Sequence, residues 1–455
     1  MHTDQTIAAL STAYGKGGVA LIRISGKDAF TVAKKLFVPK KIPFENITPR
    51  RAVFGDFYFH GKAVDNGILT LFPASSSYTG EDTAECSCHG GILLSELLLQ
   101  AALENGAVLA DKGEFTFRAM MNGNLSLSQV EAIPDLIEAE SVDKLTLAAK
   151  NSGGALEREL ASLRERILKV VSSTYAYIDY PDEDLTELTE SDMKAELGSI
   201  RDRIDRLLST YRTGKAVSEG IRCAIVGRPN TGKSSLLNLL CGEEKAIVTP
   251  EEGTTRDIIE QTVPIGRILL RLSDTAGIRE SDSTVERIGI DRAREAISLS
   301  SLVFLVLDSS SPLTPDDEKL FPLLEGKECV LILNKSDLPG KLAPGEWETR
   351  FPHRVSLSAK TGEGKEKLVS LLDEMYRTDL IESEDAIVTG ARVGAALKSA
   401  SEDLSRALTA LGDGFTQDIA AIELEHAIAM LDGKTAIETT DSILSDLFSR
   451  FCIGK

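Results

Sequence analysis

The sequence predicts a multidomain protein of the α/β and α classes: an N-terminal α+β domain, a helical domain, and a doubly wound α/β domain inserted into the helical one. Three observations support this prediction. The chain has 455 residues, which is about three times an ordinary domain length. Residues 216–380 alternate strand-like and helix-like runs. The segments on either side of them repeat apolar residues with a helical period.

The first domain is expected over residues 1–120, where short β-rich runs alternate with turns. Residues 19–24 and 53–59 read as strands, and two glycines precede an apolar, helix-like run at 92–103. This order of short elements predicts a small α+β domain.

The helical domain is expected in two pieces, residues 121–215 and 381–455. Apolar residues recur in both at spacings of three and four, which is typical of amphipathic helices. They are Leu156, Leu160, Leu163, Ile167, Val170, Ile200, Ile204, Leu207 and Leu208 in the first piece, and Leu397, Leu404, Leu408, Leu411, Ile419, Ile422, Ala427, Ile428 and Leu431 in the second. Pro181, in an acidic stretch, is expected to mark a turn between two helices of the first piece.

The segment between these pieces, residues 216–380, predicts an inserted domain. Its strand candidates are 221–226, 268–272, 302–308 and 329–333, each followed by a turn and a helix-like run. Each helical piece has an apolar stripe that needs a partner, whereas the α/β segment is complete by itself. The simplest packing therefore joins the two helical pieces into one domain.

The composition restricts the class of protein. Lys and Arg number 51 and Asp and Glu 70, for a net charge of −19, so binding of nucleic acid by bulk phosphate neutralisation is disfavoured. No run of about 18 apolar residues occurs, and residues 1–5 lack the order of a secretory signal. With six cysteines in so long a chain, we expect a cytoplasmic protein with reduced thiols and no membrane contact.

Cys86, Cys88 and His89 suggest a metal site at first sight. A single C-x-C-H lacks the second ligand cluster that is typical of zinc sites. Alternation along a strand would direct both thiols into a core, and we favour this interpretation over zinc.

A phosphate-binding loop is predicted at residues 227–234, which read GRPNTGKS and match G-x-x-x-x-G-K-[ST]. The strand candidate 221–226 precedes the loop, and a helix is expected to begin near Ser235. Backbone N–H groups of such a loop surround phosphate oxygens, and the helix N-terminus adds its positive end. Lys233 is expected to reach the β- and γ-phosphates, and the Ser234 hydroxyl to bind Mg²⁺.

Three further motifs predict that the nucleotide is GTP. Residues 274–277 read DTAG, where the carboxylate takes Mg²⁺ through water and the glycine N–H meets the γ-phosphate. Residues 334–337 read NKSD. A carboxylate there pairs with the guanine N1–H and exocyclic amine, whereas adenine would leave it unpaired at a cost. Residues 358–360 read SAK and supply the loop expected at the guanine carbonyl.

The group that orients the attacking water is not evident from these motifs. Residues 253–257 read GTTRD and fit switch I, with Thr255 able to complete the Mg²⁺ shell. Many small GTPases place a Gln where this chain has Ile278, which cannot orient a water. A cation, a distant carboxylate or a partner domain must act instead. The Asn230 carbonyl could hold a monovalent cation near the phosphates, or Asn230 merely shapes the loop.

Several of these sequences resemble a known family. The runs GRPNTGKSSLLN, GTTRD and DTAGIR resemble the potassium-activated GTPases related to Era. The sequences at 78–82 (YTGED), 89–91 (HGG), 113–115 (GEF) and 451–455 (FCIGK) narrow the resemblance to the TrmE family of tRNA modification GTPases. The resemblance covers essentially the whole chain, including the inserted domain.

The resemblance implies a fold and a reaction. The first domain would bind a tetrahydrofolate derivative, 5-formyl or 5,10-methylene, and would form a homodimer. With the FAD-dependent partner MnmG, in a heterotetramer, the family adds an aminomethyl or carboxymethylaminomethyl group at C5 of the wobble uridine of tRNA. The two inserted GTPase domains would meet across the dimer when K⁺ and GTP are bound.

The resemblance also implies how GTP is hydrolysed. Asn230 would coordinate K⁺ together with backbone carbonyls of Thr249, Glu251 and Thr254. Glu286 would position the attacking water, although from the sequence alone Glu286 reads as a solvated charge on a helix.

Lys233 and Thr255 would act in catalysis with that carboxylate, and Ser234 and Thr255 would hold Mg²⁺. The complete set of residues expected at GTP is Asn230, Thr231, Gly232, Lys233, Ser234, Ser235, Thr249, Thr254, Thr255, Asp274, Thr275, Ala276, Gly277, Asn334, Lys335, Asp337, Ser358, Ala359 and Lys360.

In the first domain, the resemblance implies a folate site that includes Arg23, Glu85 and Lys455. A folate glutamate tail needs cations, and a pterin ring presents N–H donors to a carboxylate. Asn124 belongs to the same set but stands where the family usually has Lys, so one cation is missing. Cys452 matches the near-terminal Cys of the family, for which a redox role and a tail-docking role are both open.

The rival interpretation is a GTP-switched RNA-binding or ribosome-assembly factor of the Era type. Such factors usually append a basic RNA-binding domain after the GTPase domain. Here residues 381–455 contain 6 Lys and Arg against 13 Asp and Glu and read as helices, which favours the tRNA-modifying enzyme. A GTP hydrolase without an RNA role is a third alternative.

Overall fold

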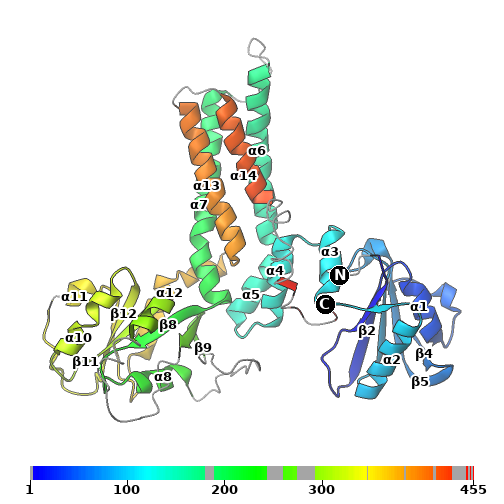
Figure 1. Ribbon diagram of the computed structural model, residues 1–455, viewed down its shortest axis with the longest axis horizontal. Helices are drawn as coiled ribbons and strands as arrows, with labels where there is room; N and C mark the ends of the chain where they lie inside the picture. Colours follow the sequence, from blue (N-terminus) through cyan, green and yellow to red (C-terminus); the bar gives the residue numbers. More distant parts are fainter. Residues whose placement is uncertain are drawn as a thin grey trace. The chain divides into compact units, whose positions relative to one another are not determined.

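The computed structural model of the chain (Figure 1) divides into two compact units. It describes residues 4–179, 189–242, 260–273, 293–345, 347–383, 386–412, 417–432, 447–448, 451 and 454. Unit 1 comprises residues 1–138, 151–169 and 425–455, and unit 2 comprises residues 139–150 and 170–424. Within the described ranges, none of the helices has the length and apolar character that a membrane span requires.

Unit 1 is built on a seven-stranded sheet in the order β3-β4-β5-β6-β2-β1-β7. The strands are β1 (Ile7–Leu10), β2 (Val19–Ser25), β3 (Phe37–Pro39), β4 (Val53–Phe59), β5 (Lys62–Phe72), β6 (Thr83–His89) and β7 (Val108–Leu109). Neighbouring strands are antiparallel except β1 and β7, which run parallel. The strands predicted at 19–24 and 53–59 are confirmed as β2 and β4.

Helices α1 (Ala29–Leu36) and α2 (Ile92–Glu104) pack against one face of this sheet and share its apolar core. The helix predicted at 92–103 is thus confirmed. Because side chains alternate along a strand, Cys86 and Cys88 on β6 both face this core. Burial raises the pKa of the Cys86 thiol to about 12 and that of Cys88 to about 11, so the core interpretation of these cysteines is confirmed.

The remaining described part of unit 1 is helical. It includes α3 (Glu114–Met121), α4 (Leu127–Ile137) and the first part of α6 (Ala155–Asp179). Phe448 and Phe451, close to the C-terminus, lie buried against Val130 and Ile133 of α4. The last residues of the chain therefore belong to the core of the unit that contains its first strand.

Unit 2 contains a six-stranded sheet in the order β13-β12-β11-β8-β10-β9. The strands are β8 (Ile221–Val226), β9 (Glu260–Ile265), β10 (Ile268–Ser273), β11 (Leu302–Asp308), β12 (Glu328–Asn334) and β13 (Arg354–Ser356). All pairs are parallel except β9 with β10. The four predicted strands are confirmed within a residue at each end, and the doubly wound α/β domain is confirmed with them.

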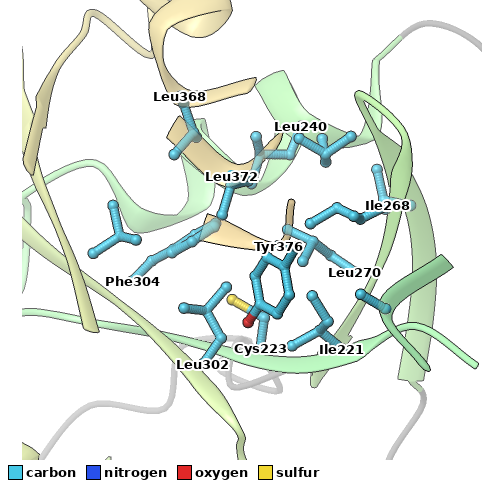
Figure 2. Close-up of a cluster of buried hydrophobic side chains, with 14 of the residues drawn as sticks. Ile221, Cys223, Leu240, Ile268, Leu270, Leu302, Phe304, Leu368, Leu372 and Tyr376 are labelled. Atoms are coloured by element: carbon cyan, nitrogen blue, oxygen red, sulfur yellow. The ribbon is translucent and has the colours of Figure 1, made fainter. Parts of the chain in front are cut away.

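Both faces of this sheet are covered, which explains why most residues of its central strands are apolar. One core contains Leu302, Phe304, Leu368, Leu372 and residues of β8 and β10 (Figure 2). A second core on the other face contains the alternate residues of β8 and β11 with side chains from 320–324 and 347–351. The helices and 3-10 turns of this domain are α8 (Lys233–Cys241), α10 (Pro315–Glu318), η3 (Phe321–Leu324), α11 (Trp347–Arg350), α12 (Lys365–Met375) and η4 (Thr378–Glu382).

The flanking helices follow the predicted apolar spacing with one exception. They are α5 (Val142–Ser152), α6, α7 (Glu190–Ser218), α13 (Ala391–Gly412) and α14 (Gln417–Asp432). On α14, Ile419 and Ile422 are exposed, whereas Ala420 and Leu424 are buried. The prediction is therefore wrong for these two isoleucines, whereas the predicted Ala427 and Leu431 are buried. Pro181 lies outside the described residues.

Candidate functional site

The phosphate-binding loop lies between β8 and α8, at the carboxyl edge of the parallel sheet. Gly232 has a left-handed φ of +96° and caps α8, which begins at Lys233, two residues before the predicted start. Asn230 also has a positive φ, of +65°, and is exposed at the turn of the loop. Thr231 is buried and donates its hydroxyl hydrogen bond to the Arg228 carbonyl at 3.1 Å. The motif thus forms the strand–loop–helix that a phosphate site requires.

The Lys233 ammonium lies inside this loop. Its Nζ donates hydrogen bonds to the carbonyl oxygens of Gly227 at 2.9 Å and Arg228 at 2.8 Å. Burial, and to a smaller extent the charge of Arg228, lower the pKa of Lys233. These two carbonyls therefore hold the positive charge of Lys233 within the loop that is predicted to surround phosphate oxygens.

Three of the predicted nucleotide loops meet at Asn334. This residue is 2% exposed, and its Nδ2 donates to the Thr231 carbonyl at 2.8 Å while its Oδ1 accepts from the Ala359 N–H at 2.9 Å. One amide therefore joins the phosphate loop, the NKSD loop and the SAK loop. The structure brings these three predicted motifs together.

The carboxylate of Asp337 stands at the surface of the same loop cluster. A hydrogen bond from Ser358 lowers its pKa, and the positive charges of Lys360 and Lys335 act in the same direction. The carboxylate is therefore ionised at neutral pH and can accept two donors from one edge of a base.

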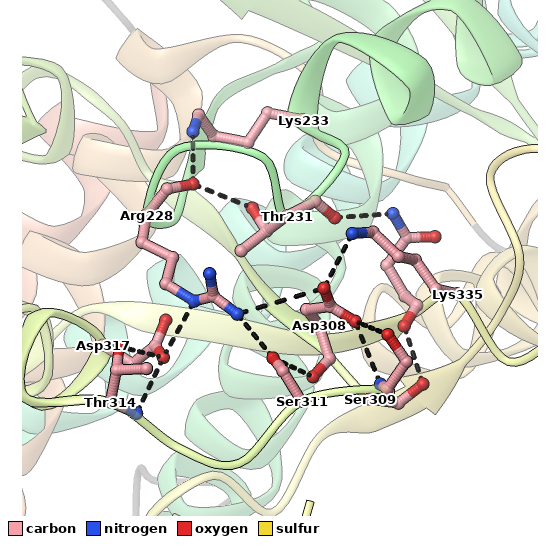
Figure 3. A network of polar contacts seen from close by, with 11 residues as sticks. Arg228, Thr231, Lys233, Asp308, Ser309, Ser311, Thr314, Asp317 and Lys335 are labelled. Carbon is pink, nitrogen blue, oxygen red and sulfur yellow. Dashed lines mark hydrogen bonds and ion pairs between the residues drawn. The ribbon is translucent and has the colours of Figure 1, made fainter. Parts of the chain in front are cut away.

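Sequence reasoning missed a charged network beneath these loops (Figure 3). Asp308, the last residue of β11, pairs with Lys335, and Arg228 pairs with Asp317 at the start of α10. The position of Asp308 at the end of a predicted strand could have revealed this network, because ligand sites of parallel sheets form at the carboxyl ends of adjacent strands.

Oxygen ligands suited to the expected Mg²⁺ and K⁺ ions are present in the described part of the site. The Ser234 hydroxyl lies exposed in the first turn of α8, and the Asn230 side chain is exposed beside it. Hydroxyl and amide oxygens are hard ligands that fit Mg²⁺ and K⁺. The remaining predicted residues of the site lie outside the described residues: Thr249, Glu251, Thr254, Thr255, Asp274, Thr275, Ala276, Gly277 and Glu286.

The predicted folate residues of unit 1 include a directly bonded pair. Arg23 on β2 lies opposite Glu85 on β6, and its Nε and Nη2 contact the same carboxylate oxygen at 3.0 Å and 2.9 Å. The Arg23 guanidinium also lies 5.6 Å from the Phe115 ring centroid and 5.9 Å from that of Tyr78. This pair, flanked by two aromatic rings, is part-exposed on the sheet face away from α1 and α2.

Asn124 supports the loop beside this pair. Its Nδ2 donates to the carbonyls of Ser77 at 3.2 Å and Tyr78 at 3.1 Å, so here the side chain positions the Tyr78 segment. The C-terminal tail also reaches this region, because the Ser11 hydroxyl donates to the Gly454 carbonyl at 2.9 Å. Lys455 and Cys452 lie outside the described residues.

A buried ion-pair network near this pair was not predicted. Arg118, on α3, contacts Glu81 at 2.9 Å and Glu114 at 3.0 Å, and Glu81 also accepts a hydrogen bond from Ser25 at 2.9 Å. The spacing of Glu114 and Arg118 on one helix was the available signal. The network fixes α3 to the strand that carries Arg23.

Comparisons with known proteins agree over the whole chain. Family models match as "MnmE helical domain" at residues 127–452 and "GTP-binding protein TrmE N-terminus" at residues 6–124. The chain is 37% identical over 454 residues to the tRNA modification GTPase MnmE of Thermotoga petrophila, covering 99% of this chain and 100% of that protein. It is 39% identical over 457 residues to the protein of that name from Ligilactobacillus salivarius, covering 99% and 98%. Among solved structures, the G domain of T. maritima FeoB is 27% identical, covering 34% of this chain and 98% of that one, with a TM-score of 0.26.

Proposed function

The chain belongs to the MnmE (TrmE) family of tRNA modification GTPases, and from that premise we propose the details of its cycle. It hydrolyses GTP with activation by K⁺. With the FAD-dependent partner MnmG, it drives addition of an aminomethyl or carboxymethylaminomethyl group at C5 of the wobble uridine in tRNA. The observation that carries the proposal is full-length similarity to these GTPases together with three nucleotide loops that meet at Asn334.

The described residues support a division of labour at GTP. Lys233 supplies positive charge to the β- and γ-phosphates, and Ser234 holds Mg²⁺, which neutralises charge that develops on them. Asp337 reads the guanine edge, and its lowered pKa keeps it an acceptor. Asn230 holds K⁺ from its exposed position in the loop, and Glu286 orients the water.

In unit 1, we propose that Arg23 and Glu85 bind the tetrahydrofolate derivative. Their ion pair is part-exposed beside the exposed Tyr78 ring, and an aromatic ring beside a guanidinium fits a flat heterocycle with donors on its edge. Lys455 completes the site, and the contact of Gly454 with Ser11 supports this by carrying the tail to the end of β1.

We further propose that unit 1 forms a homodimer through the sheet face opposite α1 and α2. Phe54 and Ile68 are cross-strand neighbours there, and Ser87 and Leu21 continue the row. Phe54 is 54% exposed and Ile68 42%, which favours burial by a second copy. Light scattering tests this: Phe54→Asp should give a monomer, and an unchanged dimer would exclude this face.

The tRNA product gives the most direct test of the function. Mass spectrometry of tRNA nucleosides should show loss of the C5-modified wobble uridine in cytoplasmic extracts of cells that lack the protein. Re-expression of the chain should restore the modified nucleoside, and a Lys233→Ala variant should not. An unchanged nucleoside profile would exclude the role in tRNA modification.

Potassium activation is tested separately. Purified protein should hydrolyse GTP faster in KCl than in NaCl at matched ionic strength, because the smaller cation does not fit the same ligands. Asn230→Ala should abolish the difference between the two salts. Equal rates for the unmodified protein would remove the cation from the proposal while leaving GTP hydrolysis in place.

A further inference from the structure

We propose that Asp308 is a positioning residue for GTP binding: its carboxylate connects the phosphate loop, through Arg228, to the guanine-reading loop, through Lys335 (Figure 3). Asp308 belongs to none of the nucleotide motifs. The inference rests on the proposed nucleotide site and adds to it a residue that holds two of its loops in register.

The topology places Asp308 between the two loops. β11 pairs in parallel with β8, which leads into the phosphate loop, and with β12, which leads into the NKSD loop. Asp308 lies opposite Asn334 in the register of β11 and β12. A carboxylate at the end of the central strand can therefore reach the loops that follow both neighbours.

The carboxylate of Asp308 is held rigidly. Its Oδ1 accepts hydrogen bonds from the Ser310 N–H at 2.9 Å and the Ser310 hydroxyl at 2.6 Å. This leaves Oδ2 for the two loops, with Lys335 Nζ at 2.7 Å and Arg228 Nη2 at 3.9 Å. Because Asp308 is only 8% exposed, water screens these charges weakly.

Lys335 needs a constraint of this kind. Its backbone has a φ of +67°, in the left-handed region that side-chain-bearing residues rarely adopt. Its neighbour Asn334 carries the contacts to the other nucleotide loops, and Asp337 is two residues further on. Fixing the Lys335 side chain on Asp308 therefore fixes the orientation of the whole NKSD turn.

Arg228 is anchored from its other side as well. Its Nε donates to Asp317 Oδ2 at 3.2 Å, and Nη2 donates to the Ser311 hydroxyl. Asp317 is buried, and its Oδ2 also accepts from the N–H and hydroxyl of Thr314 at the start of α10. Without Asp308, Arg228 would keep only these partners among the described residues, and the phosphate loop would lose its ionic connection to the guanine loop.

The substitution Asp308→Asn isolates this connection. The amide keeps an oxygen that can accept from Ser310, but it removes the negative charge between Lys335 and Arg228. Because hydrogen bonds and ion pairs between charged groups are stronger than those between neutral groups, we expect the Kd for GDP and for a non-hydrolysable GTP analogue to rise about tenfold or more, by similar factors. The kcat at saturating GTP should stay within about threefold, because the residue does not touch the reacting atoms.

Two matched variants serve as controls. Asp316→Asn removes an exposed carboxylate eight residues away, whose partner is Lys319, directly after α10, and it should leave both Kd values unchanged. Asp308→Glu keeps the charge and should restore most of the nucleotide affinity. GDP binding by Asp308→Asn within twofold of the unmodified protein, whatever its thermal stability, would overturn the proposal.

A double-mutant cycle decides the matter if Asp308→Asn does not fold. Arg228→Gln and Lys335→Gln each remove one of the two cations that contact Asp308, and their effects on GDP affinity should be non-additive if both act through its carboxylate. Additive effects would overturn the proposal. Failure of the unmodified protein to bind GDP at all would instead contradict the proposed nucleotide site, so the two failures are distinguishable.

Discussion

At the residue scale, Asn334 and Asp337 have different environments within the NKSD loop. Asn334 is buried, and its amide group forms hydrogen bonds with Thr231 and Ala359, so it holds the loops of the site together. Asp337 is exposed, and its carboxylate is available to a base. Two polar residues of one motif therefore have different sensitivities to substitution: loss of Asn334 should disrupt the loops, and loss of Asp337 should change what they recognise.

The substitution Asp337→Asn should relax the preference for guanine. An amide in place of the carboxylate offers one donor and one acceptor, which matches the xanthine edge better than two guanine donors. We expect GTP hydrolysis at low substrate concentration to fall by about 10²-fold or more and XTP hydrolysis to rise. Competition between the two nucleotides measures this, and an unchanged preference for GTP would show that Asp337 does not read the base.

The pKa of Asp308 predicts how the stability of unit 2 depends on pH. Burial tends to raise this pKa, but hydrogen bonds from Lys335 and Ser310 and the Lys335 charge outweigh burial, and the pKa is lowered. Such a carboxyl contributes stability above its unfolded-state pKa, and the contribution is lost as the pH falls through the lower folded-state pKa. Asp308→Asn should therefore lower the Tm at pH 7, and the difference should shrink below about pH 4. A difference in Tm that is the same at both pH values would contradict this account.

At the element scale, α7 contains two glycines that predict opposite effects. A Cβ on Gly214 would lie 2.1 Å from the Val388 carbonyl oxygen, whereas a Cβ on Gly198 would meet no atom within 4 Å. The helix backbone therefore comes close to the 386–390 segment at Gly214. The same substitution at the two positions separates close packing from helix propensity.

Gly214→Ala should destabilise the protein by about 1–3 kcal/mol, because backbone must move to admit the methyl group. Gly198→Ala should stabilise it by about 0.5–1 kcal/mol, since alanine loses less backbone entropy in a helix. Urea unfolding measures both free energies. If both substitutions stabilised the protein, the approach of α7 to Val388 would not be as close as described.

Elements were predictable from the sequence where one physical signal dominates. β8 and β11 are largely buried on both faces and consist mostly of apolar residues, and their bounds were predicted correctly. β9 reads EQTVPI and joins the sheet at its edge, where a proline is tolerated and the apolar signal is weak. Ile419 and Ile422 misled the prediction for α14, since a helical period does not say which of two adjacent stripes is buried.

The candidate site likewise contains a part that was predictable from the sequence and a part that was not. The phosphate loop and the NKSD and SAK motifs were predictable because each is a local sequence with its own chemistry. The links from Asp308 to Lys335 and from Arg23 to Glu85 depend on strand register, Asp308 opposite Asn334 and Arg23 opposite Glu85. Register joins residues 26 and 62 positions apart in these two cases, and no local pattern contains that information.

At the scale of the whole chain, the two ends meet in one unit. The tail closes on unit 1 through Phe448 and Phe451, which pack with each other and against Phe117, and through Gly454 at the end of β1. Gly113 permits this packing, because a Cβ there would lie 2.7 Å from the Phe448 ring. The stability of unit 1 therefore depends on Phe448, Phe451 and Gly454, which lie far from its strands in the sequence.

Phe448→Ala tests this dependence. The side chain is fully buried, so its loss should destabilise unit 1 by about 3–5 kcal/mol, and a displaced tail should weaken binding of 5-formyltetrahydrofolate through Lys455. Calorimetry measures folate affinity, and thermal unfolding measures stability. Leu93→Ala, at an exposed position of the same unit, is the control and should change neither by much. If Phe448→Ala lowered stability but left folate affinity intact, the tail would be a structural brace and Lys455 would have no part in the folate site.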